Sequence, residues 1–314
     1  MSDEEDEFAG EVDKSTHGEA GESSPRAGDF TAEVVFDKRL TFEEASRCLN
    51  MLGKDETGMR YAYLKITATE RKLTDVSVVL SFKHVLFVEV GDNLLTFDSL
   101  QVLAEMPYLI MLNAEGNRIN SAAFERMSYL QVLKLSRNLV LDTKDVDQPA
   151  LEHLGLNHNQ IYLSQFESDR LEQLKQLELR GNFLTDLSGS YPASLEALYL
   201  AENRIKELTL SSADFRRLAV LHLRENYVRK LDGLGRADLP SLRYLNLRKN
   251  KITKFRQFRK LARLPKLETL IVLGNPFYGE EEKPGEDDEE LGDEEEKEDI
   301  ARQRRDHASH RVED

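Results

Sequence analysis

The sequence predicts an α/β solenoid, because one pattern, LxxLxLxxN, recurs nine times along the chain. Successive asparagines are 21 to 25 residues apart, the period of repeats that each supply one short strand and one return turn. After the clearest unit, residues 239–252, an apolar residue occurs at every third position from Phe255 to Leu267, which indicates 3₁₀ turns. We therefore expect a leucine-rich repeat horseshoe of about ten repeats, with short parallel strands on its concave side and 3₁₀ or helical turns on its convex side.

The asparagines of the pattern are expected to be structural. Alternation around Leu245 and Leu247 predicts a strand whose leucines point into the core, and the asparagine follows where the chain turns. A buried amide there can bond to backbone groups that the turn leaves unpaired, and stacked repeats would align these amides as a ladder. The predicted asparagine ladder consists of Asn93, Asn117, Asn138, Asn159, Asn182, Asn203, Asn226, Asn250 and Asn275.

The two ends of the repeat array are less regular. Residues 61–69 resemble a degenerate first repeat with Thr69 at the asparagine position, and a capping-box pattern at Thr41 and Glu44 predicts an amphipathic helix before it. We expect this helix to cover the first repeat. Its expected apolar side consists of Ala45, Cys48, Leu49 and Leu52. Cys48 is therefore expected to be a buried apolar residue. After residues 275–278 the chain becomes acidic, with no apolar helix or strand to close the core.

Charge divides the chain into four parts. The formal net charge of the 314 residues is −15, but residues 1–29 hold ten acidic and two basic residues, and residues 279–314 hold seventeen and six. The body between them is mildly basic. We expect a disordered acidic tail over residues 1–29, a region with the capping helix over 30–59, the leucine-rich repeat domain over 60–278, and a disordered or helical tail, acidic and then basic, over 279–314.

Several functional classes lack a basis in the sequence. No run of eighteen apolar residues occurs and the N-terminus is acidic, so neither a membrane span nor a secretory signal is expected. A single cysteine and no Asn-x-Ser/Thr sequon indicate a cytosolic or nuclear protein. No phosphate-binding, dinucleotide-binding, HExxH or paired-cysteine motif occurs, so we expect no enzyme, no cofactor and no metal.

Two histidines in one repeat, His153 and His158, are candidate metal ligands. The facing positions of the neighbouring repeats would have to supply the remaining ligands, and they are Gln176, Glu178, Val132 and Lys134. This set favours two polar histidines on an exposed strand over a metal centre.

The concave sheet is the expected binding surface. The third, fifth and seventh positions of the pattern point out of the core there, and solenoids commonly bind partners on this face. Phe87, Met111 and Val132 form an apolar strip at one end, and aromatic residues alternate with arginines at the other. Exposed tyrosine and arginine are typical of interface hot spots. The candidate partner-binding residues are Phe87, Met111, Val132, Arg180, Tyr199, Arg224, Tyr244 and Arg248.

A basic run follows the concave candidates. From Arg248 to Lys266 there are nine basic residues and no acidic one, which is an electrostatic footprint for nucleic acid, a tubulin surface or an acidic protein segment. The chain's own acidic residues 279–299 are a further candidate, because tethering gives them a high effective concentration. Nucleic acid would rest on this run alone and is not favoured. The predicted basic rim consists of Lys249, Lys251, Lys254, Arg256, Arg259, Lys260, Arg263 and Lys266.

Residues 60–76, RYAYLKITATERKLTDV, together with the repeat turns at 113–119, 177–182, 221–226 and 261–267, resemble the family of leucine-rich repeat-containing protein 23. The resemblance covers residues 40–277, and residues 60–76 are its most specific part because they are not repeat consensus. Members of this family continue after the Asn-Pro turn with a closing cap, whereas here Pro276 leads into acidic sequence.

The resemblance implies a non-catalytic scaffold of the axoneme. Such a protein would dock other proteins of the head of radial spoke 3, and so support ciliary and sperm flagellar motility. Its partners would be other radial spoke and axonemal proteins, in the cytoplasm, cytoskeleton and cilium or flagellum axoneme. The acidic C-terminal tail leaves one alternative: an acidic leucine-rich nuclear regulator that binds histones or inhibits a phosphatase.

Overall fold

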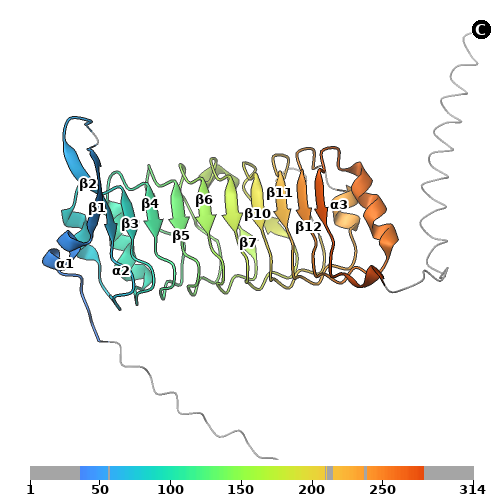
Figure 1. Cartoon of the computed structure of the whole chain (residues 1–314), viewed down its shortest axis with the longest axis horizontal. Helices are drawn as coiled ribbons and strands as arrows, with labels where there is room; N and C mark the ends of the chain where they lie inside the picture. Colours follow the sequence, from blue (N-terminus) through green and yellow to red (C-terminus); the bar gives the residue numbers. More distant parts are fainter. Residues whose placement is uncertain (1–35, 56, 209, 211–214, 237–238, 279–314) are drawn as a thin grey trace, which may run out of the picture. The chain divides into compact units, whose positions relative to one another are not determined.

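The computed structural model describes residues 36–55, 57–208, 210, 215–236 and 239–278. Eleven short strands form one sheet in chain order, interrupted only where β7 and β9 leave it to form a separate two-stranded sheet (Figure 1). All neighbouring strands from β2 to β13 are parallel, which confirms the predicted leucine-rich repeat solenoid. The predicted tails, residues 1–29 and 279–314, lie outside the described residues.

The strands of the large sheet are β1 (Leu49–Lys54), β2 (Tyr61–Thr67), β3 (Phe87–Glu89), β4 (Met111–Asn113), β5 (Val132–Lys134), β6 (His153–Gly155), β8 (Gln176–Glu178), β10 (Ala197–Tyr199), β11 (Val220–His222), β12 (Tyr244–Asn246) and β13 (Thr269–Ile271). The small sheet pairs β7 (Ser164–Gln165) with β9 (Gly189–Ser190). The return segments contain the helices α1 (Phe42–Arg47), α2 (Phe97–Gln101) and α3 (Asp232–Arg236), and the 3₁₀ helices η1 (Ser77–Ser81), η2 (Val102–Glu105), η3 (Ser168–Arg170), η4 (Phe255–Arg263) and η5 (Pro276–Tyr278).

Register across the sheet follows the repeat pattern position by position. Leu198 pairs with Leu221 and Leu221 with Leu245, and all three side chains are fully buried. The residue before each asparagine has a positive φ, which the left-handed turn out of the strand requires. Glycine occupies that place at Gly116, where a Cβ would come within 2.2 Å of Asp92 Oδ1. The residues with this turn geometry are Asp92, Gly116, Arg137, His158, Gly181, Glu202, Glu225, Lys249 and Gly274.

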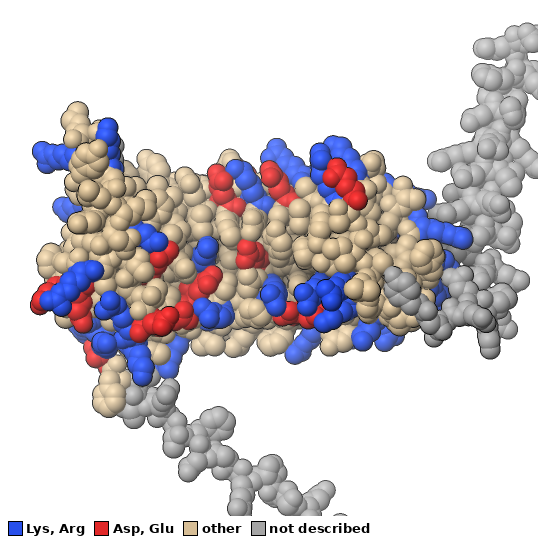
Figure 2. All heavy atoms as spheres, in the orientation of Figure 1, with Lys and Arg blue, Asp and Glu red and all other residues tan. Residues whose placement is uncertain are grey.

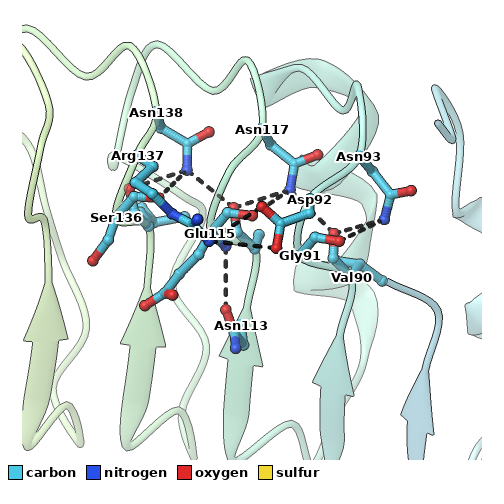
Figure 3. A network of polar contacts seen from close by, with 12 residues as sticks. Val90, Gly91, Asp92, Asn93, Asn113, Glu115, Asn117, Ser136, Arg137 and Asn138 are labelled. Carbon is cyan, nitrogen blue, oxygen red and sulfur yellow. Dashed lines mark hydrogen bonds and ion pairs between the residues drawn. The ribbon is translucent and has the colours of Figure 1, made fainter. Parts of the chain in front are cut away.

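The asparagine ladder is built from amide-to-backbone hydrogen bonds (Figure 3). Asn117 is representative: its Nδ2 donates to the carbonyl of Ala114 in its own turn at 3.0 Å and to that of Val90 in the preceding repeat at 3.1 Å. Its Oδ1 accepts from the N–H of Leu95, also in the preceding repeat, at 3.0 Å. Each asparagine amide thus links the backbone of its own repeat to that of the preceding repeat. The predicted ladder consists of these links.

The first repeat is displaced from its predicted register by two residues. Lys65 pairs with Phe87, which places Arg71, not Thr69, at the asparagine position. The positive φ of Glu70 agrees with this register, as does the bond from the Leu73 N–H to Asn93 Oδ1. The prediction failed because no asparagine marks this repeat.

The N-terminal cap also differs from the prediction. The capping box between Thr41 and Glu44 is present, but the helix ends at Arg47 and Cys48 forms its buried C-cap. Residues 49–54 form β1, which pairs antiparallel with β2 and covers its outer edge. Leu52, expected on the apolar side of the helix, is therefore an exposed strand residue.

Candidate partner-binding surface

Strand register brings the predicted apolar strip together. Phe87, Met111 and Val132 begin β3, β4 and β5, and each pairs with the next. Their side chains are half-buried, while the residues that follow them, such as Leu112, are fully buried. The strip therefore lies on the face of the sheet opposite the core, as strand alternation requires.

Three rings form a continuous stack on the same face, farther along the chain. The ring of His222 lies 5.4 Å from that of Tyr199 and 5.0 Å from that of Tyr244, with interplanar angles of 30° and 21°. Burial, and then Arg224, lower the pKa of His222, so the imidazole is neutral near pH 7. Burial raises the pKa of Tyr199. Sequence reasoning selected the two tyrosines but missed His222, although its place at the fifth position of its repeat was visible.

The candidate arginines are held in position by carboxylates or by burial. Arg180 contacts Glu202 at 2.6 Å, and this bond raises the pKa of the guanidinium. Arg224 contacts Glu225 at 2.8 Å. Arg248 is half-buried, and its Nε has no hydrogen-bond partner among the described residues. The carboxylates therefore orient the guanidinium groups of Arg180 and Arg224 before any partner binds, which lowers the entropy cost of docking.

A polar cluster lies between the apolar strip and the ring stack. The carboxylate of Glu178 is 3.1 Å from His153 Nε2 and accepts from Gln176 Nε2 at 2.7 Å and from Asn157 Nδ2 at 2.6 Å. These contacts, the one from His153 first, lower the pKa of Glu178 to about 2. Sequence reasoning named His153, Gln176 and Glu178 only to reject a metal site. The register places them at facing positions, as expected, but the spacing does not give the rotamers that bring their polar atoms together.

The predicted basic rim is divided between two places. Lys249 lies at the turn that follows β12, where it bonds to Glu225 at 2.7 Å. Arg256, Arg259, Lys260 and Arg263 lie on η4, on the return side, and Lys260 bonds to Asp232. In the view of Figure 2, Lys and Arg side chains occur at both ends of the body, and those at the end opposite β1 have few acidic side chains beside them. The rim therefore lies on the turn after β12 and on the return segment that leads to β13, and does not extend along the rest of the solenoid.

Among the described residues the geometry offers surfaces for binding. In the part of the chain that the structure describes, no three His, Cys, Asp or Glu residues are grouped so that they could hold a metal ion. The same residues include no helix that is long and apolar enough to cross a membrane.

Comparison with known proteins agrees with this architecture. The family model described as "Leucine rich repeat" matches residues 216–277. Among solved structures, the chain resembles the TLR13–ssRNA13 complex, with a TM-score of 0.55, 20% identity, and coverage of 68% of this chain and 36% of that one. The LRIM1/APL1C complex gives a TM-score of 0.51, 17% identity, and coverage of 67% and 39%. Identities this low show the fold alone.

Curated relatives are more informative. Human leucine-rich repeat-containing protein 23 is 34% identical over 241 residues, which span 77% of this chain and 69% of the human protein. The mouse protein of the same name is 38% identical over 232 residues, spanning 74% and 67%. Leucine-rich repeat proteins are typically non-catalytic scaffolds that bind other proteins. The chain belongs to the family of leucine-rich repeat-containing protein 23.

Proposed function

We propose that this chain is a non-catalytic scaffold of the axoneme that docks proteins of the head of radial spoke 3 and so supports ciliary and sperm flagellar motility. Membership of the family supports the axonemal setting through the role that the resemblance implies. The concave face carries the docking part of the proposal. Its partners are other radial spoke and axonemal proteins, and its location is the cytoskeleton of the cilium or flagellum.

The observation that carries a docking function is a row of large side chains at each end of the concave face, with the polar cluster around Glu178 between them. Half-buried Phe87, Met111 and Val132 are followed along the sheet by the stack of Tyr199, His222 and Tyr244. Large apolar and aromatic side chains that project from a rigid sheet supply binding energy at low entropy cost. Solvent alone does not require such a row.

The test is retention of the tagged chain on axonemes. The chain is expressed in cells with motile cilia, the membranes are removed with detergent, and the tag is followed in the axonemal and soluble fractions. We expect retention that yields to high salt, with radial spoke proteins in the same extract. The double substitution Tyr199→Ala with Tyr244→Ala should release the chain, because it removes two rings of the stack.

The matched control changes two tyrosines outside the concave stack. Tyr162 and Tyr227 are exposed, so Tyr162→Ala with Tyr227→Ala should leave retention unchanged. Release of the unsubstituted chain into the soluble or nuclear fraction would contradict the axonemal proposal. That outcome would favour the alternative, an acidic leucine-rich nuclear regulator.

A further inference from the structure

The last strand of the solenoid is an open edge. In the repeat before it, the N–H groups of Leu247 and Lys249 donate to the carbonyls of Ile271 and Leu273. The equivalent N–H groups of the last repeat belong to Val272 and Gly274, and they have no hydrogen-bond partner in the part of the chain that the structure describes. Two backbone N–H donors, two residues apart as in the preceding repeat, are therefore available to a further strand.

Apolar side chains accompany these donors. Leu270 is 38% exposed, although Leu245, at the same position of the preceding repeat, is fully buried. Leu273 is 59% exposed, and Val272 is half-buried. Leu270 and Val272 align with the buried Leu245 and Leu247, whereas Leu273 aligns with Arg248 on the opposite face. A strand added beside β13 would thus cover the core-facing side chains of Leu270 and Val272 as well as satisfy backbone donors.

The charge around this edge is strongly one-sided. Residues 248–278 contain nine basic residues and a single acidic one, Glu268. Arg259, in the middle of η4, and Lys266, between η4 and β13, are both exposed. An occupant of this edge must therefore tolerate or neutralise positive charge.

We propose that the β13 edge binds an acidic, extended segment of a partner protein, which adds a strand to the sheet and places alternate apolar side chains over Leu270 and Val272. This inference rests on the proposed scaffold function and names the partner chemistry of a second docking surface on it. Strand addition of this kind draws affinity from backbone hydrogen bonds and specificity from alternate side chains.

Two other occupants fit less well. A second copy docked edge to edge would bring two strongly basic last repeats together, which costs free energy. The chain's own residues 279–314 have the right charge, but their apolar residues are only Leu291, Ile300, Ala301, Ala308 and Val312, and no two of them are two positions apart. A covering strand needs that alternation.

The test uses the full chain and a labelled short peptide in which valine and glutamate alternate. We expect binding by fluorescence anisotropy at low salt, and protection of the Val272 and Gly274 amides from hydrogen exchange in the complex. A peptide in which lysine replaces glutamate should not bind. Val272→Pro should weaken binding about fivefold, because it removes one outward donor without removing an internal bond.

Charge reversal at the edge supplies the matched comparison. Arg259→Glu with Lys266→Glu should weaken binding by about tenfold or more. Lys206→Glu with Lys230→Glu makes the same change in net charge at exposed residues of other repeats, and should leave affinity near that of the parent. Equal weakening by both pairs would show nonspecific attraction and overturn the proposal.

Hydrogen exchange of the Val272 and Gly274 amides in the chain without peptide tests for the two other occupants, the chain's own tail and a second copy. Protection of the two amides that is independent of protein concentration would identify the chain's own tail as the occupant, and protection that rises with concentration would identify a second copy. Either result would overturn the proposal. None of these outcomes bears on axonemal retention through Tyr199 and Tyr244, so failure of this inference and failure of the proposed function can be told apart.

Discussion

The two ends of the solenoid differ in how the edge of the sheet and the apolar core are covered. At the N-terminal end, β1 covers the edge of β2, and α1 packs against η1 with Phe42 stacked on Phe82 at 5.1 Å. Ile66, the core residue of the first repeat, is fully buried, whereas its counterpart in the last repeat, Leu270, is 38% exposed. One end is closed by the chain itself, and the described residues leave the other open. A solenoid with one closed end should be least stable at the opposite end.

The largest expected difference between the ends is in their core residues. Ile66→Ala should lower the free energy of unfolding by about 3 kcal/mol, because it leaves a cavity that the cap cannot fill. Leu270→Ala should cost only about 1 kcal/mol, since the side chain is already partly in water. Urea denaturation followed by circular dichroism measures both, and Tyr162→Ala is the exposed control. Equal losses would mean that the C-terminal core is covered in solution.

Substitutions in the asparagine ladder should likewise cost less stability at the C-terminal end. Asn182 bonds to the carbonyls of Leu156 and Leu179 and accepts from the Ile161 N–H, all of them buried. Asn182→Ala should cost about 2 kcal/mol, because these groups lose their partners away from water.

Asn275 makes the equivalent bonds in the last repeat, with Leu247, Val272 and Ile252. Asn275→Ala should cost about half as much, because its bond to the Val272 carbonyl is only partly buried, whereas the bonds of Asn182 to Leu156 and Leu179 are buried. Exposed Asn120→Ala should have no measurable effect. If Asn182→Ala and Asn275→Ala lower the free energy of unfolding equally in urea denaturation, the last repeat excludes water as well as the middle repeats do.

The repeats were predictable because leucine alternation and asparagine spacing determine strand position directly. Leu221, Leu245 and Asn250 occupy the places that the pattern gives them. The first repeat was misplaced by two residues because Arg71 stands where later repeats have asparagine. β1 was missed because the capping box predicts where a helix begins, but not that pairing with β2 ends it at Arg47.

The candidate surface was predictable by face but not by contact. Strand alternation placed Phe87, Tyr199 and Tyr244 on the concave side. The ion pair of Arg180 with Glu202 and the cluster around Glu178 depend on side chains that meet across repeats. One-dimensional spacing does not encode those rotamers, so these contacts could only be found in the structure.

The cap of the closed end provides a smaller effect. The Thr41 hydroxyl accepts from the Glu44 N–H at 3.3 Å, and the Glu44 carboxylate accepts from the Thr41 N–H at 3.1 Å. Thr41→Ala should cost about 1 kcal/mol and speed hydrogen exchange in α1. Thr253→Ala, an exposed change at the opposite end, should do neither. Unchanged exchange in α1 would show that tertiary packing alone holds the helix.

A pH-dependent comparison of interior and end carboxylates should give a similarly small effect. The pKa of Glu178 is lowered from 4.5 to about 2 by its contacts, so the ionised form stabilises the fold at pH above about 4.5. That stabilisation should disappear as pH falls from about 4.5 to about 2. Because the side chain is partly exposed, Glu178→Gln should cost only about 1 kcal/mol at pH 7.

The control for this comparison is Glu268→Gln at the open end. Glu268 pairs with Arg243 at 3.0 Å, but both side chains are more than half exposed, so its loss should change stability by at most a few tenths of a kcal/mol. Urea denaturation at several pH values between 7 and 3 measures the gap between each variant and the parent. The difference in free energy of unfolding between the parent and Glu178→Gln should narrow as pH falls. Glu178 becomes protonated in the parent, which then loses the stabilisation by the ionised carboxylate that the variant lacks at every pH. A gap that stays constant down to pH 3 would mean that the carboxylate contributes through packing and not through its charge.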